Sequence, residues 1–289
     1  ISLMAIVLDN ITYTYGMGTP FEKTALHGIS LTIENGEFLG VIGHTGSGKS
    51  TFVQHLNGLL HPTTGTVTVN GVDISASTEE AKKMRHKVGM VFQYPEHQLF
   101  EETIAEDIAF GPKNLGLSAD EVDERVRDAM KFVGLDYNTY AERSPFHLSG
   151  GQMRRVAIAG VVAMNPDFLV LDEPSAGLDP FGREEIFEEI IHLHKEKGIT
   201  VILVSHNMED ISRMASRLVV LDKGRIVLDG EPMDIFNNHR DALQAVGVDV
   251  PPVSVTMEYL REQGLDVSNR VLSVDDAVQA ILEGGSHVK

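Results

Sequence analysis

The segment from Gly43 to Ser50 has the residue types and spacing needed to hold phosphate groups. It reads GHTGSGKS and fits the phosphate-loop pattern G-x-x-x-x-G-K-[ST], after an apolar strand and before a helix. Glycines let successive backbone N–H groups curl around phosphates, and the helix N-terminus adds partial positive charge. Lys49 is expected to reach the outer phosphates, and Ser50 to ligate magnesium. The candidate nucleotide-binding residues here are Gly43, His44, Thr45, Gly46, Ser47, Gly48, Lys49, Ser50 and Thr51.

Two acids, Asp172 and Glu173, end the apolar segment FLVLDE. A parallel sheet presents ligand sites at the carboxyl ends of its strands, so these acids are expected beside the phosphate loop. Asp172 would hold a hydrated magnesium ion, directly or through water. Glu173 would polarise the attacking water as a general base. The alternative is an acidic turn in solvent, which the phosphate loop makes the weaker interpretation.

Two more polar residues follow apolar segments: His206 after TVILVS, and Gln93 in VGMVFQYPEHQ. His206 is expected to contact the γ-phosphate and report its presence. Gln93 is expected to bind the metal or the attacking water and to respond to movement of the helical segment that follows. A structural histidine and an ordinary loop amide are the alternatives.

An aromatic residue near the N-terminus is a candidate for binding a base. Tyr15 precedes the irregular stretch GMGTPFEKTA. Its ring face is expected to stack on adenine, and Tyr13 is the competing choice.

A second glycine turn, LSGGQ, opens the helical segment QMRRVAIAGVVAM. Its residues Ser149, Gly150, Gly151 and Gln152 would form another anion-binding helix end. One nucleotide needs one cradle, and the long helical stretch between the two argues against their meeting within a chain. We therefore expect a two-fold, head-to-tail pair in which the turn of one chain caps the γ-phosphate held by the other. Asp179 is expected near the contact between chains, and a helix cap without chemical use is the alternative.

The elements that position these residues follow an α/β pattern. Alternating segments over residues 1–42 and the turn signal Asn35-Gly36 predict antiparallel strands. Residues 93–165 carry helical spacing. Apolar strands then alternate with helices as in a mostly parallel sheet, up to a hairpin through Lys223-Gly224. Short helices are expected beyond 230.

Composition limits the class of protein. The 289 residues are 42% hydrophobic and 23% charged, as in a globular protein, and no apolar run is long enough to span a bilayer. The net charge of −18 argues against a general nucleic-acid surface. The chain contains no cysteine, so it forms no disulfides, and without a secretory signal a cytoplasmic location is expected.

In this order, GHTGSGKS, FQ, LSGGQ, LVLDEP, SAGLD and SH resemble the motifs of ATP-binding cassette (ABC) ATPases over roughly residues 5–230. The resemblance implies an α/β P-loop NTPase (RecA-like) core with an antiparallel β-subdomain and an α-helical subdomain at about 93–165. It implies ATP and Mg²⁺ as ligands and, with Glu173 and His206 both present, a hydrolytically competent site. The expected ATPase domain is 4–230, and 231–289 is expected to be a small helical extension.

Longer segments are similar to ATPase subunits of energy-coupling factor (ECF) transporters, importers of vitamins and transition-metal ions. These segments are VFQYPEHQLFEETIAEDIAFGPKNLG, LSGGQMRRVAIAGV and GMGTPFEKTAL, the last resembling the second, A-prime type of subunit. The resemblance implies a sister ATPase, usually in a heterodimer, a transmembrane coupling protein and a substrate-capturing membrane protein. It implies a peripheral location on the cytoplasmic face of the cell membrane and a C-terminal extension that helps to hold the dimer. The choice between heterodimer and homodimer stays open.

The segment QYPEHQLFEE carries Tyr94, Leu99 and Phe100 between polar and acidic residues. Such a patch suits a groove for a basic, apolar-faced coupling helix. Alternatively, these side chains hold the loop against its own domain.

Other functions remain open from the sequence. They are the ATPase of another ABC importer, an ABC ATPase acting on nucleic acid and, more remotely, a P-loop kinase. The nucleic-acid class usually has long coiled-coil insertions or a duplicated cassette, and this chain has neither. A kinase has no evident use for LSGGQ.

Overall fold

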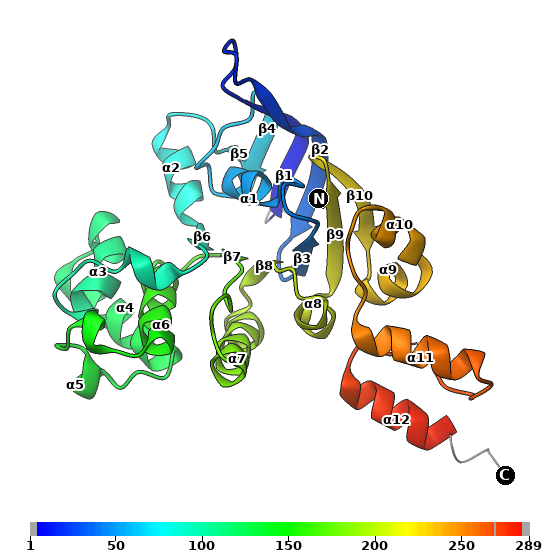
Figure 1. The fold of residues 1–289 in the computed structure, drawn as a ribbon. Helices are drawn as coiled ribbons and strands as arrows, with labels where there is room; N and C mark the ends of the chain where they lie inside the picture. Colours follow the sequence, from blue (N-terminus) through cyan, green and yellow to red (C-terminus); the bar gives the residue numbers. More distant parts are fainter. Residues whose placement is uncertain (1–4, 269, 285–289) are drawn as a thin grey trace.

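A computed structural model describes residues 5–268 and 270–284 and contains two β-sheets (Figure 1). The smaller sheet is antiparallel, with the strand order β2 (Lys23–Glu34), β1 (Ala5–Tyr15), β4 (Thr64–Val69) and β5 (Val72–Asp73). The larger sheet has the order β10 (Arg225–Gly230), β9 (Arg217–Asp222), β3 (Phe38–Ile42), β8 (Thr200–Val204), β7 (Phe168–Asp172) and β6 (Val88–Val91). Its strands are parallel except β10, which pairs with β9 as the expected closing hairpin.

One early expectation was wrong. Asn35-Gly36 does not join an antiparallel pair: it joins β2 to β3, which belong to different sheets. The strand β3 is buried at every position and lies between the parallel strands β8 and β9. A fully buried strand of five residues has no alternating pattern that would reveal its sheet.

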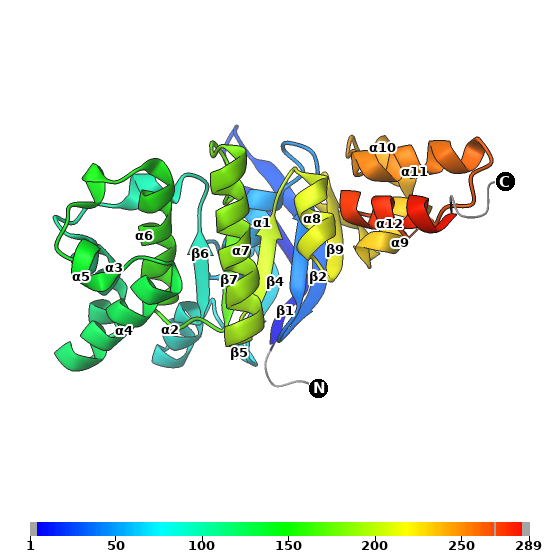
Figure 2. The ribbon, with the colours of Figure 1, turned by 90° about the horizontal axis from the view of Figure 1, so that it is seen from below.

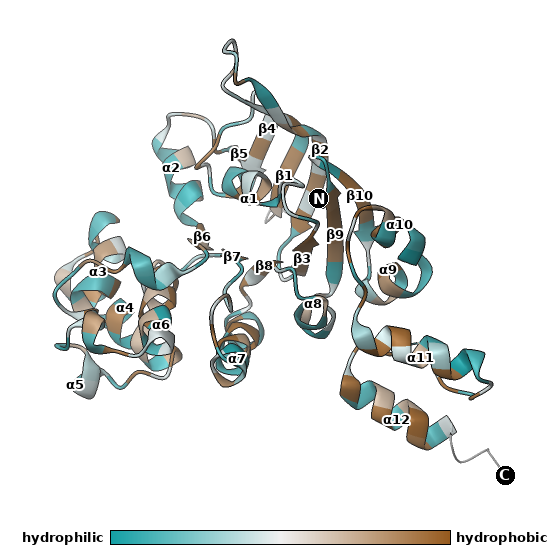
Figure 3. Cartoon of the chain, viewed as in Figure 1, coloured by the Kyte–Doolittle hydropathy of each residue, from teal (hydrophilic) through white to brown (hydrophobic). Residues whose placement is uncertain are grey.

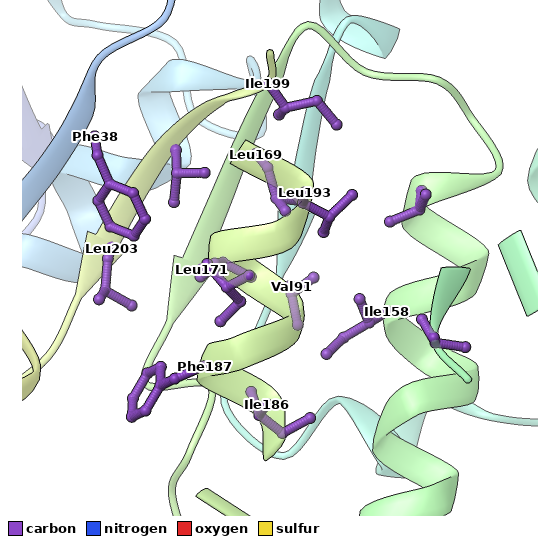
Figure 4. Packing of buried hydrophobic residues seen from close by; sticks show 14 of the residues in the cluster. Phe38, Val91, Ile158, Leu169, Leu171, Ile186, Phe187, Leu193, Ile199 and Leu203 are labelled. Carbon is purple, nitrogen blue, oxygen red and sulfur yellow. The ribbon is translucent and has the colours of Figure 1, made fainter. Parts of the chain in front are cut away.

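Two apolar cores lie on the two faces of the larger sheet. Between the sheets, α1 (Lys49–Leu56) contributes Phe52 and Leu56 to one core. On the opposite face, α7 (Pro180–Lys197) packs Ile186, Phe187 and Leu193 against β7 and β8 (Figure 4). The helix α8 (Met208–Met214) connects β8 to β9. This packing fixes the carboxyl ends of β3, β7 and β8 relative to α1.

A group of helices lies beside the larger sheet, at the β6 edge (Figures 1 and 2). The helix α2 (Glu79–His86) precedes β6, and the group itself comprises η1 (Pro95–Gln98), α3 (Ile104–Asn114), α4 (Ala119–Phe132), α5 (Tyr137–Tyr140), η2 (Pro145–His147) and α6 (Gly150–Val162). It falls within the segment 93–165 that the sequence marked as helical.

The segment after β10 divides into two parts. The helices α9 (Pro232–Asn238) and α10 (Arg240–Ala245) bury Phe236 and Leu243 in the same core as the apolar side chains of α7. The helices α11 (Pro252–Glu262) and α12 (Val274–Gly284) form a small core of their own around Met257 and Ala277. Figure 3 shows that α12 is rich in hydrophobic residues. The proposed limits at Met4 and Lys289 lie outside the described residues.

None of the helices in the described part of the chain is long and apolar enough to cross a membrane.

Candidate nucleotide site

A cavity of about 590 Å³ opens between the end of β1, the phosphate loop and the carboxyl ends of β7 and β8. Residues that the sequence assigned to separate roles meet there. Those lining the cavity are Tyr15, Thr45, Gly46, Gly48, Lys49, Ser50, Thr51, Gln93, Asp172, Glu173 and His206. The predicted loop residues Gly43, His44 and Ser47 do not line this cavity.

The phosphate loop needs glycine for steric reasons. A Cβ at Gly43 would lie 2.4 Å from the carbonyl oxygen of Leu221 and 2.5 Å from Ser47 Oγ. Gly46 and Gly48 have φ of 82° and 105°, where a side chain is strained. The ammonium of Lys49 donates to the carbonyl oxygens of Gly43 at 2.6 Å and His44 at 2.9 Å. The ammonium of Lys49 therefore binds carbonyl oxygens of its own loop.

The charges of Lys49, Asp172 and Glu173 influence one another. Burial lowers the pKa of Lys49, and the charges of Glu173 and Asp172 oppose this effect. Burial raises the pKa of Asp172, the charge of Glu173 raises it further, and Lys49 opposes both. A hard dication beside Asp172 and the Ser50 hydroxyl would relieve this repulsion, since both groups offer the oxygen ligands that Mg²⁺ prefers.

Glu173 has an unusual backbone conformation. Its φ is 51°, in the left-handed region, although it is not glycine. Its N–H donates to the carbonyl oxygen of Val204 at 2.9 Å. Its carboxylate lies 2.7 Å from Nδ1 of His206, whose side chain is 79% exposed. Such conformations cost about 1–3 kcal/mol and concentrate at functional sites.

The signature residues lie outside this cavity. Ser149 caps α6, and its Oγ accepts from the N–H of Gln152 at 3.3 Å, in a capping box. Ser149 and Gly150 are exposed, and a Cβ on Gly150 or Gly151 would meet nothing within 4 Å. Asp179 caps α7 by accepting from the N–H of Gly182 at 2.7 Å.

Comparisons with known proteins agree with this arrangement. Residues 26–176 match the ABC transporter family. The chain is 53% identical to "Energy-coupling factor transporter ATP-binding protein EcfA2" of Clostridium tetani, over 97% of both chains. It is 49% identical to the protein of the same name from Bacillus cereus, over 98% of both. The chain belongs to the ABC transporter family of ATPases.

Solved structures similar to this ABC ATPase support the same assignment. CbiO1 from Clostridium perfringens, described as part of the ABC transporter complex cbiONQ, is 36% identical with a TM-score of 0.73 over 88% of this chain and 98% of that one. The ATP-binding cassette MJ0796, solved as a dimer bound to ADP and Pi, is 32% identical with a TM-score of 0.68 over 78% and 98%. The chain is an ATP-binding protein and an ATPase of the energy-coupling factor type.

The two candidate tyrosines of this ABC ATPase occupy different surroundings. Tyr15 lines the cavity, and its hydroxyl lies 2.9 Å from Thr51 Oγ1. Tyr13 packs against the apolar core, and its ring is nearly perpendicular to that of Tyr15, with the ring centroids 4.8 Å apart. This placement favours Tyr15 as the adenine platform.

Some residues at the site were not expected from the sequence. Lys223 and Gly224 line the cavity, and the Gly224 N–H donates to the carbonyl oxygen of Ser47 at 2.8 Å. The imidazole of His44 lies 2.8 Å from Asp222. The sequence identified Lys223-Gly224 only as a hairpin turn. Nothing in the local pattern shows that this turn supports a loop about 180 residues earlier in the chain.

The three residues predicted for the coupling groove lie in two different surroundings. A separate cavity of about 380 Å³ is lined by Leu99, Phe100 and Phe110, and the Phe100 side chain is 58% exposed. Tyr94 does not line it. The Tyr94 ring stacks on His97, and its Cε1 would lie 3.0 Å from a Cβ on Gly177. Tyr94 therefore packs against the turn that follows Glu173.

Proposed function

We propose that this ABC ATPase powers an ECF-type importer by closing head-to-tail on a second ATPase subunit. Each ATP would then lie between the phosphate loop of one subunit and the signature of the other. The observation that carries this proposal is the division of the site. The cavity brings together Lys49, Asp172, Glu173 and His206. The exposed N-terminus of the signature helix α6 lies outside this cavity.

Each cavity residue has a role that suits its position. Lys49 would leave its loop carbonyls to bind the outer phosphates, while Ser50 and Asp172 would hold Mg²⁺. The metal supplies charge neutralisation on the phosphate oxygens. Glu173 would take a proton from the attacking water, and His206, hydrogen-bonded to that carboxylate, would orient it and contact the γ-phosphate.

The remaining cavity residues would recognise the nucleotide and its state. Tyr15 would stack on adenine, and Gln93 would contact the metal or the water at the border of the helical group. Asp179, the N-cap residue of α7, would lie near the partner subunit.

The names of the relatives support the proposed partners. We expect a sister ATPase, with a heterodimer favoured, a transmembrane coupling protein and a substrate-capturing membrane subunit, at the cytoplasmic face of the cell membrane. The cargo would be a vitamin or a transition-metal ion. The groove at Leu99 and Phe100 would take the coupling helix, 4–230 would be the ATPase domain, and 231–289 would contribute to the dimer contact.

Mixing two inactive variants tests the composite site. Lys49→Ala disables the phosphate loop, and Gly150→Asp places a carboxylate where the γ-phosphate would be capped. The open space around Gly150 should let the fold accept the change, and Gly150→Ala is the steric control. A mixed dimer of Lys49→Ala and Gly150→Asp chains has one site in which both halves are intact.

We expect each variant alone to be inactive and each mixed dimer to recover up to about half of the turnover of a wild-type dimer, since one of its two sites is intact. Specific activity of the wild type should fall on dilution and rise when the sister ATPase is added. Full activity at every dilution, with no recovery in the mixture, would mean that one chain forms a complete site.

A further inference from the structure

A buried arginine lies under the signature helix. Arg154, on the second turn of α6, is 1% exposed and is among the largest fully buried side chains of the described chain. Its Nε and Nη2 donate to the two carboxylate oxygens of Glu96 at 3.0 Å and 2.8 Å. Its Nη1 donates to the carbonyl oxygen of Pro174 at 2.7 Å, and Nη2 also donates to that of Ala176 at 2.9 Å.

These bonds use four of the five N–H donors of the guanidinium in one fixed geometry. The partner carboxylate is equally committed. Burial alone would raise the pKa of Glu96, but hydrogen bonds, above all to Arg154, and the nearby positive charges outweigh burial and keep the pKa below its usual value. The buried guanidinium of Arg154 therefore favours one arrangement of the segments around it. In any other arrangement a lost hydrogen bond would leave a buried polar group unpaired.

The partners of Arg154 belong to two segments that follow the cavity residues Gln93 and Glu173 in the chain. Glu96 lies in η1, three residues after Gln93. Pro174 and Ala176 belong to the turn after Glu173, which is closed by a bond of 3.1 Å from the Ala176 N–H to the Glu173 carbonyl oxygen. Arg154 thus binds two carbonyl groups of the turn that follows Glu173. The φ of Glu173 itself lies in the left-handed region.

The neighbouring arginine connects different elements. Arg155 pairs with Glu185 at 2.8 Å and Glu189 at 3.2 Å, both on α7. Within the described part of the chain, Arg155 forms no hydrogen bond or ion pair with η1 or with the turn after Glu173. Arg155 therefore joins the same signature helix to the core without touching the segment that carries Glu173, which makes it a matched control.

We propose that Arg154 is a positioning residue that links the two ATP sites of the dimer. Through Pro174 and Ala176 it holds the catalytic base Glu173 of its own chain, and through α6 it orients the signature offered to the partner's ATP. A movement of η1 would displace Glu96 and therefore Arg154, and would thereby alter both ATP sites. The inference rests on the proposed head-to-tail function and adds a residue to its mechanism.

Two mixtures separate the two effects of an Arg154→Gln chain. Mixed with Lys49→Ala, its only competent site uses its own Glu173 with the partner's intact signature. Mixed with Gly150→Asp, the only competent site uses the partner's Glu173 with the signature of the Arg154→Gln chain. We expect turnover about 10- to 100-fold below that of the parent mixture in both cases, since small misplacements of reacting groups have effects of this size.

The matched variants separate positioning from folding. ATP affinity of the isolated chain should stay at its wild-type value for Arg154→Gln, because Arg154 does not line the cavity, while kcat falls. Arg154→Lys should remain impaired, because an ammonium cannot form the two-pronged contact. Arg155→Gln should lower thermal stability and leave turnover within about two-fold of wild type, well short of the losses that small misplacements of reacting groups cause.

Several outcomes would overturn the proposal. One is wild-type turnover in either mixture. Another is wild-type turnover in Arg154→Met combined with Glu96→Leu, because that pair would fill the space without the hydrogen bonds. If the parent mixture of Lys49→Ala and Gly150→Asp recovers no activity, and the sister ATPase restores turnover to neither variant, the head-to-tail function fails instead. The kcat of Arg154→Gln in the assembly with the sister ATPase, at unchanged ATP affinity, then decides the role of Arg154 at its own Glu173.

Discussion

Replacing Glu173 by Gln is the most direct perturbation of the proposed chemistry. The amide keeps the shape of the side chain and can still bond to His206, which lies 2.7 Å from the carboxylate. It cannot accept the proton of the attacking water. A general base contributes about 10²- to 10⁴-fold to a rate, equivalent to about 3–5 kcal/mol of transition-state stabilisation. We therefore expect kcat to fall by about 10²- to 10⁴-fold.

Binding should respond differently from turnover. Glu173 is a negative charge near the phosphate site, and its charge raises the pKa of Lys49. Removing it therefore should not weaken ATP binding. Phosphate release measures turnover, and equilibrium binding of a fluorescent ATP analogue measures affinity. Glu124→Gln makes the same chemical change on the exposed face of α4 and should alter neither. Turnover of Glu173→Gln within about three-fold of wild type would refute the assignment, since a lost general base costs at least about 10²-fold.

Three further predictions follow from single contacts. Tyr15→Ala should weaken ATP binding about 5- to 100-fold with kcat retained, as expected for a lost base stack of about 1–3 kcal/mol; unchanged affinity would contradict the stack. Gly224→Ala would place a Cβ 2.1 Å from the Ala25 carbonyl oxygen. It should lower the melting temperature more than Gly18→Ala, whose φ is also positive but whose Cβ meets nothing within 4 Å. Burial raises the pKa of Glu189 from 4.5 to about 7, so folding stability should fall as pH rises through that range. Glu189→Gln should remove this slope, worth up to about 3 kcal/mol, in denaturant unfolding at pH 5 and pH 8.

The sequence predicted the parts of the site that are encoded in short segments. A phosphate loop needs its glycines, lysine and serine in one continuous turn, so Gly43 to Ser50 could be recognised without a structure. Asp172, Glu173 and His206 follow apolar strands, and parallel strands bring such residues to one edge of a sheet. Their meeting in one cavity follows from this rule.

Other features depend on contacts that no local pattern records. Gly224 supports Ser47 from a hairpin late in the chain, and Arg154 pairs with a glutamate 58 residues earlier. Tyr94 looked like a groove residue because it is aromatic and lies near Leu99. Tyr94 has a left-handed φ of 56°, and its ring lies against Gly177. Positive φ at a tyrosine is rare enough that no propensity argument would predict it.

The distribution of acids explains why an acidic protein can still bind the phosphates of ATP. The chain has a net charge of −18, and its helices α3, α4 and α8 carry acidic residues in their first turns, where the helix dipole favours them. The helices α1 and α6, which begin at the two glycine turns, carry none there. An acid in either first turn would occupy the free N–H groups and repel phosphate. Both helix ends thus keep their positive potential for an external anion. Because the α6 end lies outside the cavity that holds the phosphate loop, the anion it serves in our proposal is the γ-phosphate bound by another subunit.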